Sequence, residues 1–479
     1  MTAGAPAVSL RNSISALLRS APKSWAWMSP KRILARVQAS LLRQGKRRMP
    51  LKTLNAQVGP PVNRPRSVRQ LAPEPFPPLP EGFPPPAAQR IAQLPPYILN
   101  KINLLNDQLR ARGVDVIDFG MGNPADGVQE EVVEELRSSL KERKNHRYSA
   151  PRGILQLKEA FARHYARHFQ VELNPKTEVL MSIGSKDALS HLCLAILNPN
   201  DSCVTPTPAY MIHRYAPVLA GAHTIGVEIE EEQPGVRLLN DIQELFERVY
   251  PRPKMLILNF PHNPTAKVVD LGFFEEAVAL ARHFKFFLLN DFAYGHTCFD
   301  GYQAPSLLQV KGAKEVAVET FTMSKPYNMA GWRLGFLAGN PHLVELLGRV
   351  KTYFDYGHFQ CVQLAAAVAL ERGDAFIRKQ AETYKRRLDV LLAGMAEADW
   401  GPTVRNKATM FTWQPLPEKW RGRPSIDFCM ALAEKAGVSL SPGAGFGEEG
   451  EGHLRLALVE TEERIKTACE RIAKFLKEE

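Results

Sequence analysis

The sequence has no run of eighteen or more apolar residues, so we expect no helix that crosses a membrane. Cysteine is scarce: six are scattered among 479 residues, with no Cys-x-x-Cys pair and no histidine and cysteine cluster at metal-ligand spacing. This pattern favours reduced thiols in a reducing compartment and predicts no metal site. We find no internal repeat. With 45% hydrophobic residues the chain can form two packed cores, and we expect a cytoplasmic protein.

Acidic residues are missing from positions 1–73, where fourteen Lys or Arg residues lie between Arg11 and Arg69. Subtracting them from the total of 61 leaves 47 basic against 50 acidic residues, a net charge of −3 for the rest of the chain. Prolines gather between Pro60 and Pro96, as in an extended linker. We therefore predict that residues 1–90 form a basic, proline-rich and disordered extension.

Three roles are open for this extension. Residues 1–48 could be a transit peptide, because the segment is acid-free and rich in Ser and Arg, and the protein would then reside in an organelle. A basic arm could also bind nucleic acid or anionic lipid. There is no clean helix-turn-helix pattern, however, and we expect no nucleic-acid partner. The third possibility is an unstructured extension without a binding role.

Beyond residue 91, apolar runs of strand length alternate with segments of helical period. This alternation predicts an α/β fold with a mainly parallel central sheet covered by helices on both faces. The predicted strands of that sheet are 179–183, 202–206, 255–260, 286–290 and 316–322.

After Val350 the pattern changes to long helices with short strands, among them 409–414, 438–441 and 454–458. We therefore expect a second, α+β domain. The predicted organisation is an N-terminal arm with part of the small domain at 91–125, a large ligand-binding domain at 126–350, and a small C-terminal domain at 351–479.

Polar residues follow several of the predicted strands. In parallel α/β sheets, ligands bind at the carboxyl ends of the strands. Each such residue has a structural explanation when taken alone, but their joint occurrence indicates a ligand site. The residues are Asn263, Asp291, Tyr294 and Lys325.

Lys325 follows the apolar strand 316–322, where an ammonium group is costly to bury unless it is paired or used chemically. Burial lowers the pKa of an amine, as a lysine that forms a Schiff base requires. Eight residues later, Arg333 offers a guanidinium group suited to a phosphate.

Two further motifs point to anions. Gly184-Ser185-Lys186 joins a strand to a helix, and the free N–H groups of a helix N-terminus bind phosphate well, although Ser185 could equally be an ordinary N-cap. Arg455 lies within an apolar strand, so we expect it to have a carboxylate partner.

Taken in chain order, Gly184-Ser-Lys, Asn263-Pro-Thr, Asp291-x-x-Tyr294, Ser324-Lys325 with Arg333, and Arg455 resemble the motifs of fold-type I, pyridoxal-phosphate-dependent aminotransferases of class I/II. The resemblance covers about residues 90–479. The phrases MGNP, FPHNPTA, DFAY, SKPYNMAGWRLGF and SPGAGFG are most similar to those of bacterial alanine (glutamate–pyruvate) aminotransferases.

The resemblance implies that Lys325 binds pyridoxal 5'-phosphate (PLP) as an internal aldimine and then moves the substrate proton. Asp291 would pair with the pyridine nitrogen, Tyr294 and Asn263 would hydrogen-bond the ring's phenolic oxygen, and Tyr210 would stack on the ring. The implied phosphate-binding residues are Gly184, Ser185, Lys186, Thr322, Ser324 and Arg333.

For the substrate, the resemblance implies that Arg455 binds the α-carboxylate bidentately, with Gly122 and Asn263 assisting. The implied reaction is ping-pong transfer of an amino group between an amino acid, L-alanine above all, and 2-oxoglutarate or pyruvate. An aminotransferase specific for diaminopimelate or aspartate, or a β-lyase, would share the fold. The family also implies a homodimer in which Tyr148 reaches the phosphate of the neighbouring subunit.

A cofactor-sensing transcription regulator is the remaining alternative. It would need a winged helix-turn-helix ahead of the aminotransferase-like body, and the proline-rich extension does not provide one.

Overall fold

The computed structural model of the chain describes residues 86–96, 98–229 and 234–478. Nearly all of the predicted extension at 1–90 lies outside these ranges. The described part begins with the short helix α4 (Gln89–Ala92) and with α5 (Ile98–Ala111). Every helix within these ranges is too short or too polar to span a lipid bilayer.

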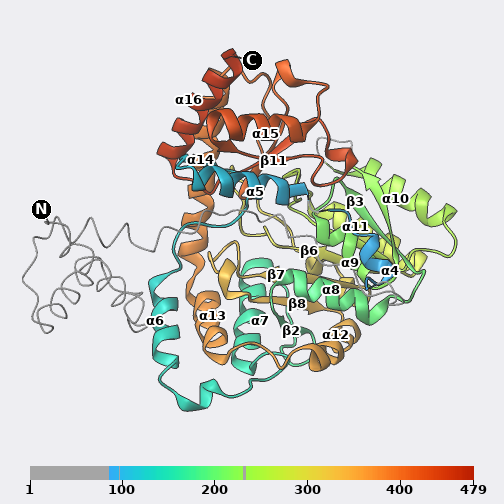
Figure 1. The fold of residues 1–479 in the computed structure, drawn as a ribbon. Coiled ribbons are helices and arrows are strands. Elements are labelled where there is room, and N and C mark those ends of the chain that lie inside the picture. The colour runs from blue at the N-terminus through green and yellow to red at the C-terminus, as the bar shows by residue number, and fades with distance from the viewer. Residues whose placement is uncertain (1–85, 97, 230–233, 479) are drawn as a thin grey trace, which may run out of the picture. The chain divides into compact units, whose positions relative to one another are not determined.

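A seven-stranded sheet organises the larger part of the described chain, and Figure 1 shows helices on both of its faces. The strand order is β2-β8-β7-β6-β5-β3-β4. Six of these strands run in one direction, and β8 runs in the opposite direction. The predicted mainly parallel α/β sheet is therefore confirmed. The strands are β2 (Val179–Ser182), β3 (Ser202–Thr207), β4 (His223–Glu228), β5 (Met255–Leu258), β6 (Phe287–Asp291), β7 (Ala317–Thr322) and β8 (Gly335–Gly339).

The two faces of this sheet are buried against different helices, as alternating side chains of β8 show. Phe336 stacks on Phe161 of α7 with ring centres 4.1 Å apart, whereas Leu337 packs with residues of α8, α9 and α12. Apolar residues on both faces of a strand are the pattern of a sheet covered on both sides. The helices of this part are α6 (Glu130–Ser139), α7 (Leu155–Phe169), α8 (Ser185–Ile196), α9 (Met211–Leu219), α10 (Val236–Arg248), α11 (Leu271–Phe284), α12 (Pro341–Phe354) and α13 (Gln360–Arg372).

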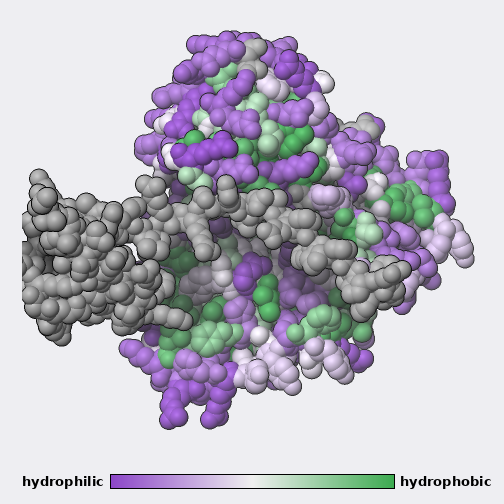
Figure 2. All heavy atoms as spheres, viewed as in Figure 1, coloured by the Kyte–Doolittle hydropathy of each residue, from purple (hydrophilic) through white to green (hydrophobic). Residues whose placement is uncertain are grey.

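The C-terminal elements build a second, smaller sheet of three antiparallel strands in the order β11-β12-β9. Its strands are β9 (Phe411–Pro415), β11 (Ser441–Pro442) and β12 (His453–Ala457), and its helices are α14 (Asp374–Glu397), α15 (Ser425–Ala436) and α16 (Glu462–Glu478). Hydrophilic side chains cover most of the region around α15 and α16 on the side shown in Figure 2, while Ile465 and Ile472 of α16 are buried.

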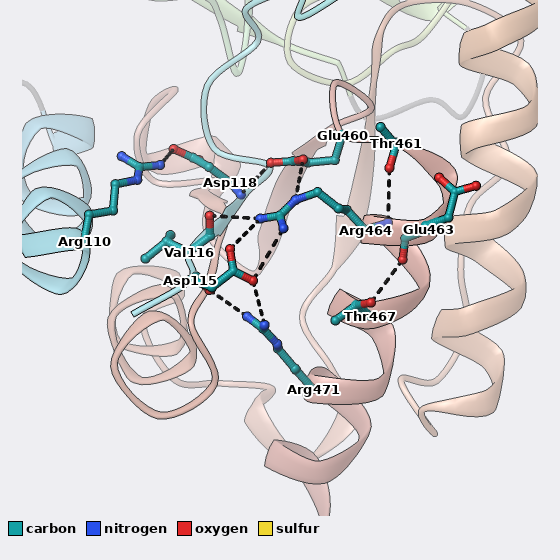
Figure 3. Close-up of polar contacts among 10 residues, drawn as sticks. All are labelled: Arg110, Asp115, Val116, Asp118, Glu460, Thr461, Glu463, Arg464, Thr467 and Arg471. Atoms are coloured by element: carbon teal, nitrogen blue, oxygen red, sulfur yellow. Dashed lines mark hydrogen bonds and ion pairs between the residues drawn. The ribbon is translucent and has the colours of Figure 1, made fainter. Parts of the chain in front are cut away.

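The N-terminal arm is fastened to these C-terminal elements. Strand β1 (Ile117–Asp118) pairs in parallel with β10 (Val438–Ser439), and the Asp115 carboxylate accepts hydrogen bonds from Arg464 and Arg471 of α16 (Figure 3). The arm and the chain end therefore form one packed unit, although they are more than 300 residues apart in sequence.

Candidate active site

A pocket of about 320 Å³ opens where the parallel strands end, between the seven-stranded sheet and β12. It brings together all the site residues predicted from the sequence except Gly184 and Tyr148, which are not among its lining residues. Those that line it are Gly122, Ser185, Lys186, Tyr210, Asn263, Asp291, Tyr294, Thr322, Ser324, Lys325, Arg333 and Arg455.

Lys325 reaches the pocket from the turn after β7. Its ammonium group donates a hydrogen bond to the Gly122 carbonyl oxygen at 2.6 Å. Burial, with the positive charges of Arg455 and Arg333, lowers the pKa of this amine to about 8. About a tenth of the amine is therefore neutral at pH 7, far more than for an ordinary lysine, and able to attack a carbonyl carbon.

Asp291 ends β6 and is held from two sides. His213 Nε2, in the first turn of α9, donates to Asp291 Oδ2 at 3.0 Å, and the Thr320 hydroxyl of β7 donates to Oδ1 at 2.8 Å. All three residues are buried. The two donors fix the carboxylate plane, so Asp291 presents a defined orientation to the pocket.

Asn263 is positioned by a network of amides. Asn259 Oδ1 accepts from the Asn263 backbone N–H at 2.8 Å, and Asn259 Nδ2 donates to the Asp291 backbone carbonyl at 2.5 Å. The loop after β5 and the end of β6 are thereby locked together. Asn259, His213 and Thr320 were not predicted, because their contacts with Asp291 join residues 29 to 78 apart and no local pattern marks them.

Arg455 lies in β12 with its guanidinium group aimed at the pocket. It donates to Asn263 Oδ1 at 3.1 Å and to the Gly120 carbonyl at 3.0 Å. Its guanidinium carbon lies 5.2 Å from the ring centre of Phe411 and 4.7 Å from that of Phe446. Aromatic faces attract a cation and restrict its movement, so they hold the guanidinium fork in place.

One end of the pocket is a cradle for an anion. Ser185 and Lys186 open α8, whose first N–H groups have no helical acceptors. Gly184 has φ +89°, and a Cβ there would lie 2.6 Å from Arg333 Nη2. A Cβ at Gly335 would lie 2.8 Å from the Ser185 backbone nitrogen. Glycines at both positions let Arg333 and the helix N-terminus approach one another and the same ligand.

Hydroxyl and aromatic side chains complete the lining. The Thr322 hydroxyl donates to Ser324 Oγ at 2.9 Å beside the cradle. Tyr210, whose backbone N–H donates to the Asn263 carbonyl, also has the Lys186 ammonium 5.3 Å from its ring centre. Tyr294 packs edge-on against Phe411, and burial raises the pKa of its phenol, so the hydroxyl remains protonated.

Tyr148 lies outside this pocket. Its side chain is 87% exposed, and its ring centre is 5.2 Å from that of Tyr356. Within one chain it therefore cannot serve as a lining residue of the pocket.

Comparison with known proteins identifies the class. The family model for aminotransferase class I and II matches residues 114–472, and the chain belongs to that family. Glutamate-pyruvate aminotransferase AlaC of Escherichia coli is 45% identical over 379 residues, covering 79% of this chain and 91% of AlaC. An LL-diaminopimelate aminotransferase of Syntrophobacter fumaroxidans is 38% identical, covering 81% of this chain and 98% of its own.

Solved structures show the same fold. A single mutant of Thermus thermophilus aspartate aminotransferase superposes with a TM-score of 0.74 at 27% identity, covering 81% of this chain and 99% of the other. The fold is thus that of the fold-type I aminotransferases.

Members of this family depend on PLP, and the pocket residues fit that cofactor. The cradle at α8 and Arg333 suits a phosphate, Asp291 suits a protonated ring nitrogen, and Lys325 supplies an amine of lowered pKa. The protein is therefore a PLP-dependent aminotransferase, which acts on an amino acid and a 2-oxo acid.

Proposed function

We propose that this aminotransferase interconverts L-alanine and 2-oxoglutarate with pyruvate and L-glutamate. The observation that carries the chemistry is a single pocket in which a lysine of lowered pKa, a carboxylate held by two donors, and a buried arginine fork converge. The 45% identity to a glutamate-pyruvate aminotransferase over most of both chains supports alanine as the amino donor.

Lys325 performs the proton transfer. Bound PLP supplies an electron-withdrawing ring that stabilises negative charge at the substrate Cα. The Lys325 amine would hold the cofactor before substrate arrives and, once released, would act as the base that takes the proton from Cα and the acid that gives it back at C4′. The Gly122 carbonyl, 2.6 Å from the amine, gives the released lysine a fixed resting position.

Asp291 keeps a proton on the pyridine nitrogen, because its carboxylate, oriented by His213 and Thr320, stabilises the protonated ring. Tyr294 and Asn263 would donate to the phenolic oxygen, and Tyr210 would stack on the ring. The phosphate would be held by Gly184, Ser185, Lys186, Thr322, Ser324 and Arg333.

Arg455 binds the α-carboxylate of the amino acid with its guanidinium fork. Asn263, which accepts a hydrogen bond from Arg455, and the Gly122 backbone assist. The carboxylate partner that the sequence led us to expect for Arg455 is then the substrate itself. Phe411 and Phe446 exclude water from the ion pair between Arg455 and the substrate carboxylate, and this strengthens the attraction between the two charges.

We also propose a homodimer in which Tyr148 reaches the phosphate of the neighbouring subunit. A monomer that exposed large aromatic side chains together would be unusual. Tyr148 and its ring neighbour Tyr356 are 87% and 62% exposed, and Tyr353 and Phe354 nearby in sequence are 92% and 65% exposed. The exposed ring pair of Tyr148 and Tyr356 suits an interface between two copies.

The domain division follows the two sheets. The seven-stranded sheet uses Val179 to Gly339 and the three-stranded sheet uses Phe411 to Ala457. This supports a large PLP-binding domain at 126–350 and a small domain built from 91–125 and 351–479, except that α13 packs with α7 of the large part.

Diaminopimelate is the second candidate substrate, since a relative named for it is 38% identical over nearly its whole length. Steady-state kcat/KM measured separately for L-alanine, L-glutamate, L-aspartate and LL-diaminopimelate decides between them. We expect alanine and glutamate to exceed the other two by at least about tenfold, which corresponds to about 1.4 kcal/mol of transition-state binding. A higher value for LL-diaminopimelate would overturn the alanine assignment. Continuous release of pyruvate and ammonia from an amino acid that carries a leaving group on Cβ, with no 2-oxo acid present, would indicate a β-lyase.

A further inference from the structure

Lys351 is a fully buried cation in the last turn of α12, which packs against α8 (Figure 1). Its ammonium group lies 3.5 Å from Oδ2 of Asp187, in the first turn of α8, and 2.8 Å from Oδ2 of Asp355. We infer that Lys351 is a positioning residue for the PLP phosphate, which acts on the N-terminus of α8 through Asp187. This inference rests on the phosphate cradle proposed above.

Asp187 brings a negative charge to a place where a phosphate binds. A carboxylate in the first turn of a helix is attracted to the positive end of the helix dipole, and it repels an anion bound at the same end. Burial would raise the pKa of Asp187, but the hydrogen bond with His191 and the charge of Lys351 outweigh burial and lower that pKa. Asp187 is therefore ionised near neutral pH, and a nearby cation is needed to offset its charge.

Asp187 also shapes the turn that leads into α8. Its Oδ2 accepts a hydrogen bond from the Ile183 backbone N–H at 2.9 Å, and its Oδ1 lies 2.9 Å from His191 Nδ1. The Ile183 carbonyl oxygen in turn accepts from Arg333 Nη2 at 3.4 Å. Lys351 contacts the same oxygen of Asp187 that holds Ile183, so it helps to place both the helix N-terminus and Arg333.

The second carboxylate, Asp355, makes the position of Lys351 critical. Asp355 Oδ1 accepts from the Gly357 backbone N–H at 2.8 Å, which fixes the loop that carries Tyr356 beside Tyr148. Without the Lys351 ammonium, two carboxylates would face one another with no positive charge between them. Their repulsion would move the first turn of α8 and leave its negative charge uncompensated beside the phosphate.

The test compares PLP with pyridoxal, which has the same ring and aldehyde but no phosphate. Full-length protein is freed of PLP by dialysis, and each compound is titrated back while the absorbance of the bound compound is recorded. Lys351→Met keeps the length of the side chain and removes its charge. We expect this variant to raise the Kd for PLP by at least about tenfold and to change the Kd for pyridoxal by less than about twofold.

Two further variants separate this role from general stability. Lys158→Met removes another largely buried lysine, on α7 and outside the pocket, and should change neither Kd. Asp187→Asn, added to Lys351→Met, removes the uncompensated charge but keeps an acceptor for the Ile183 N–H. It should recover at least about threefold of the lost PLP affinity, whereas a purely destabilised protein would gain nothing from it.

Arg333→Gln tests the phosphate cradle itself. If Arg333→Gln and Lys351→Met both keep the wild-type Kd for PLP, the cradle is wrongly assigned and the inference fails with it. If Arg333→Gln alone loses PLP affinity, the cradle stands and only the role of Lys351 is overturned.

The inference is also overturned if Lys351→Met raises the Kd for PLP and for pyridoxal by the same factor. Circular dichroism and Tm establish that each variant is folded. Should Lys351→Met not fold, Asp187→Asn alone decides, because Lys351 is then offset by one carboxylate fewer. A Kd for PLP at least about twofold below that of wild type supports the inference, and an equal or higher value overturns it.

Discussion

At the scale of single residues, a variant of Arg455 separates substrate binding from catalysis most clearly. Its guanidinium group lies between two aromatic rings and donates to Asn263 and Gly120. Arg455→Lys keeps the charge but loses the planar fork, so we expect KM to rise by at least about tenfold for every amino acid substrate. Arg464→Lys, an exposed arginine of α16 outside the pocket, is the matched control and should leave KM unchanged. An effect confined to one substrate would assign Arg455 to side-chain recognition instead.

Single residues also show how much of the site could be predicted from the sequence alone. Lys325, Asp291 and Asn263 could be placed in one site because each follows a strand of a parallel sheet, and such strand ends meet at one edge. His213 could not be found, because its contact with Asp291 joins residues 78 apart in sequence and exists only in the folded chain.

At the scale of elements, Glu319 in the middle of β7 makes the stability of the fold depend on pH. It is fully buried and accepts hydrogen bonds from Tyr165, Ser306, Asn290 and the backbone of Leu307. Burial outweighs these bonds and raises its pKa from 4.5 to about 7. The folded state therefore binds the proton more tightly than the unfolded state, and the resulting stability is complete below pH 4.5 and lost as pH rises through 7.

We expect the free energy of unfolding of the wild type to fall by up to about 3 kcal/mol between pH 4.5 and 8 through this one group. Glu319→Gln should remove that part of the pH dependence, although it lowers stability overall because an amide N–H₂ would face donors. Chemical denaturation at several pH values measures both effects, with the exposed Glu275→Gln as control. An unchanged pH profile in Glu319→Gln would show that Glu319 is ionised throughout.

Elements with an exposed face were the hardest to predict. Strand β4 was not predicted, because this edge strand has one partner, β3, and alternates polar with apolar residues instead of forming an apolar run. The predicted strand 438–441 is in fact two short strands that pair with different partners, β10 with β1 and β11 with β12. Pairings of this kind depend on distant segments that local sequence does not encode.

At the scale of the whole molecule, the proposed dimer makes cofactor binding depend on assembly. Tyr148→Phe removes only the hydroxyl and should raise the Kd for PLP by at least about fivefold, the cost of one charge-assisted hydrogen bond, with the dimer intact. Tyr250 is similarly exposed, and Tyr250→Phe should change neither the Kd for PLP nor the dimer. Sedimentation velocity and PLP titration measure the two properties. A monomer in solution with full PLP affinity would contradict both the dimer and the role of Tyr148.

The most direct test of the whole account is the absorbance of bound PLP during addition of L-alanine to wild type and to Lys325→Ala. In wild type the band should convert to that of the amine form and return when pyruvate is added. In Lys325→Ala, PLP should remain bound through Asp291 and Arg333, but turnover should fall by at least about a thousandfold, because no other group is placed to move the Cα proton. Turnover of Lys325→Ala at a rate near wild type would contradict the assignment of this pocket as the catalytic centre.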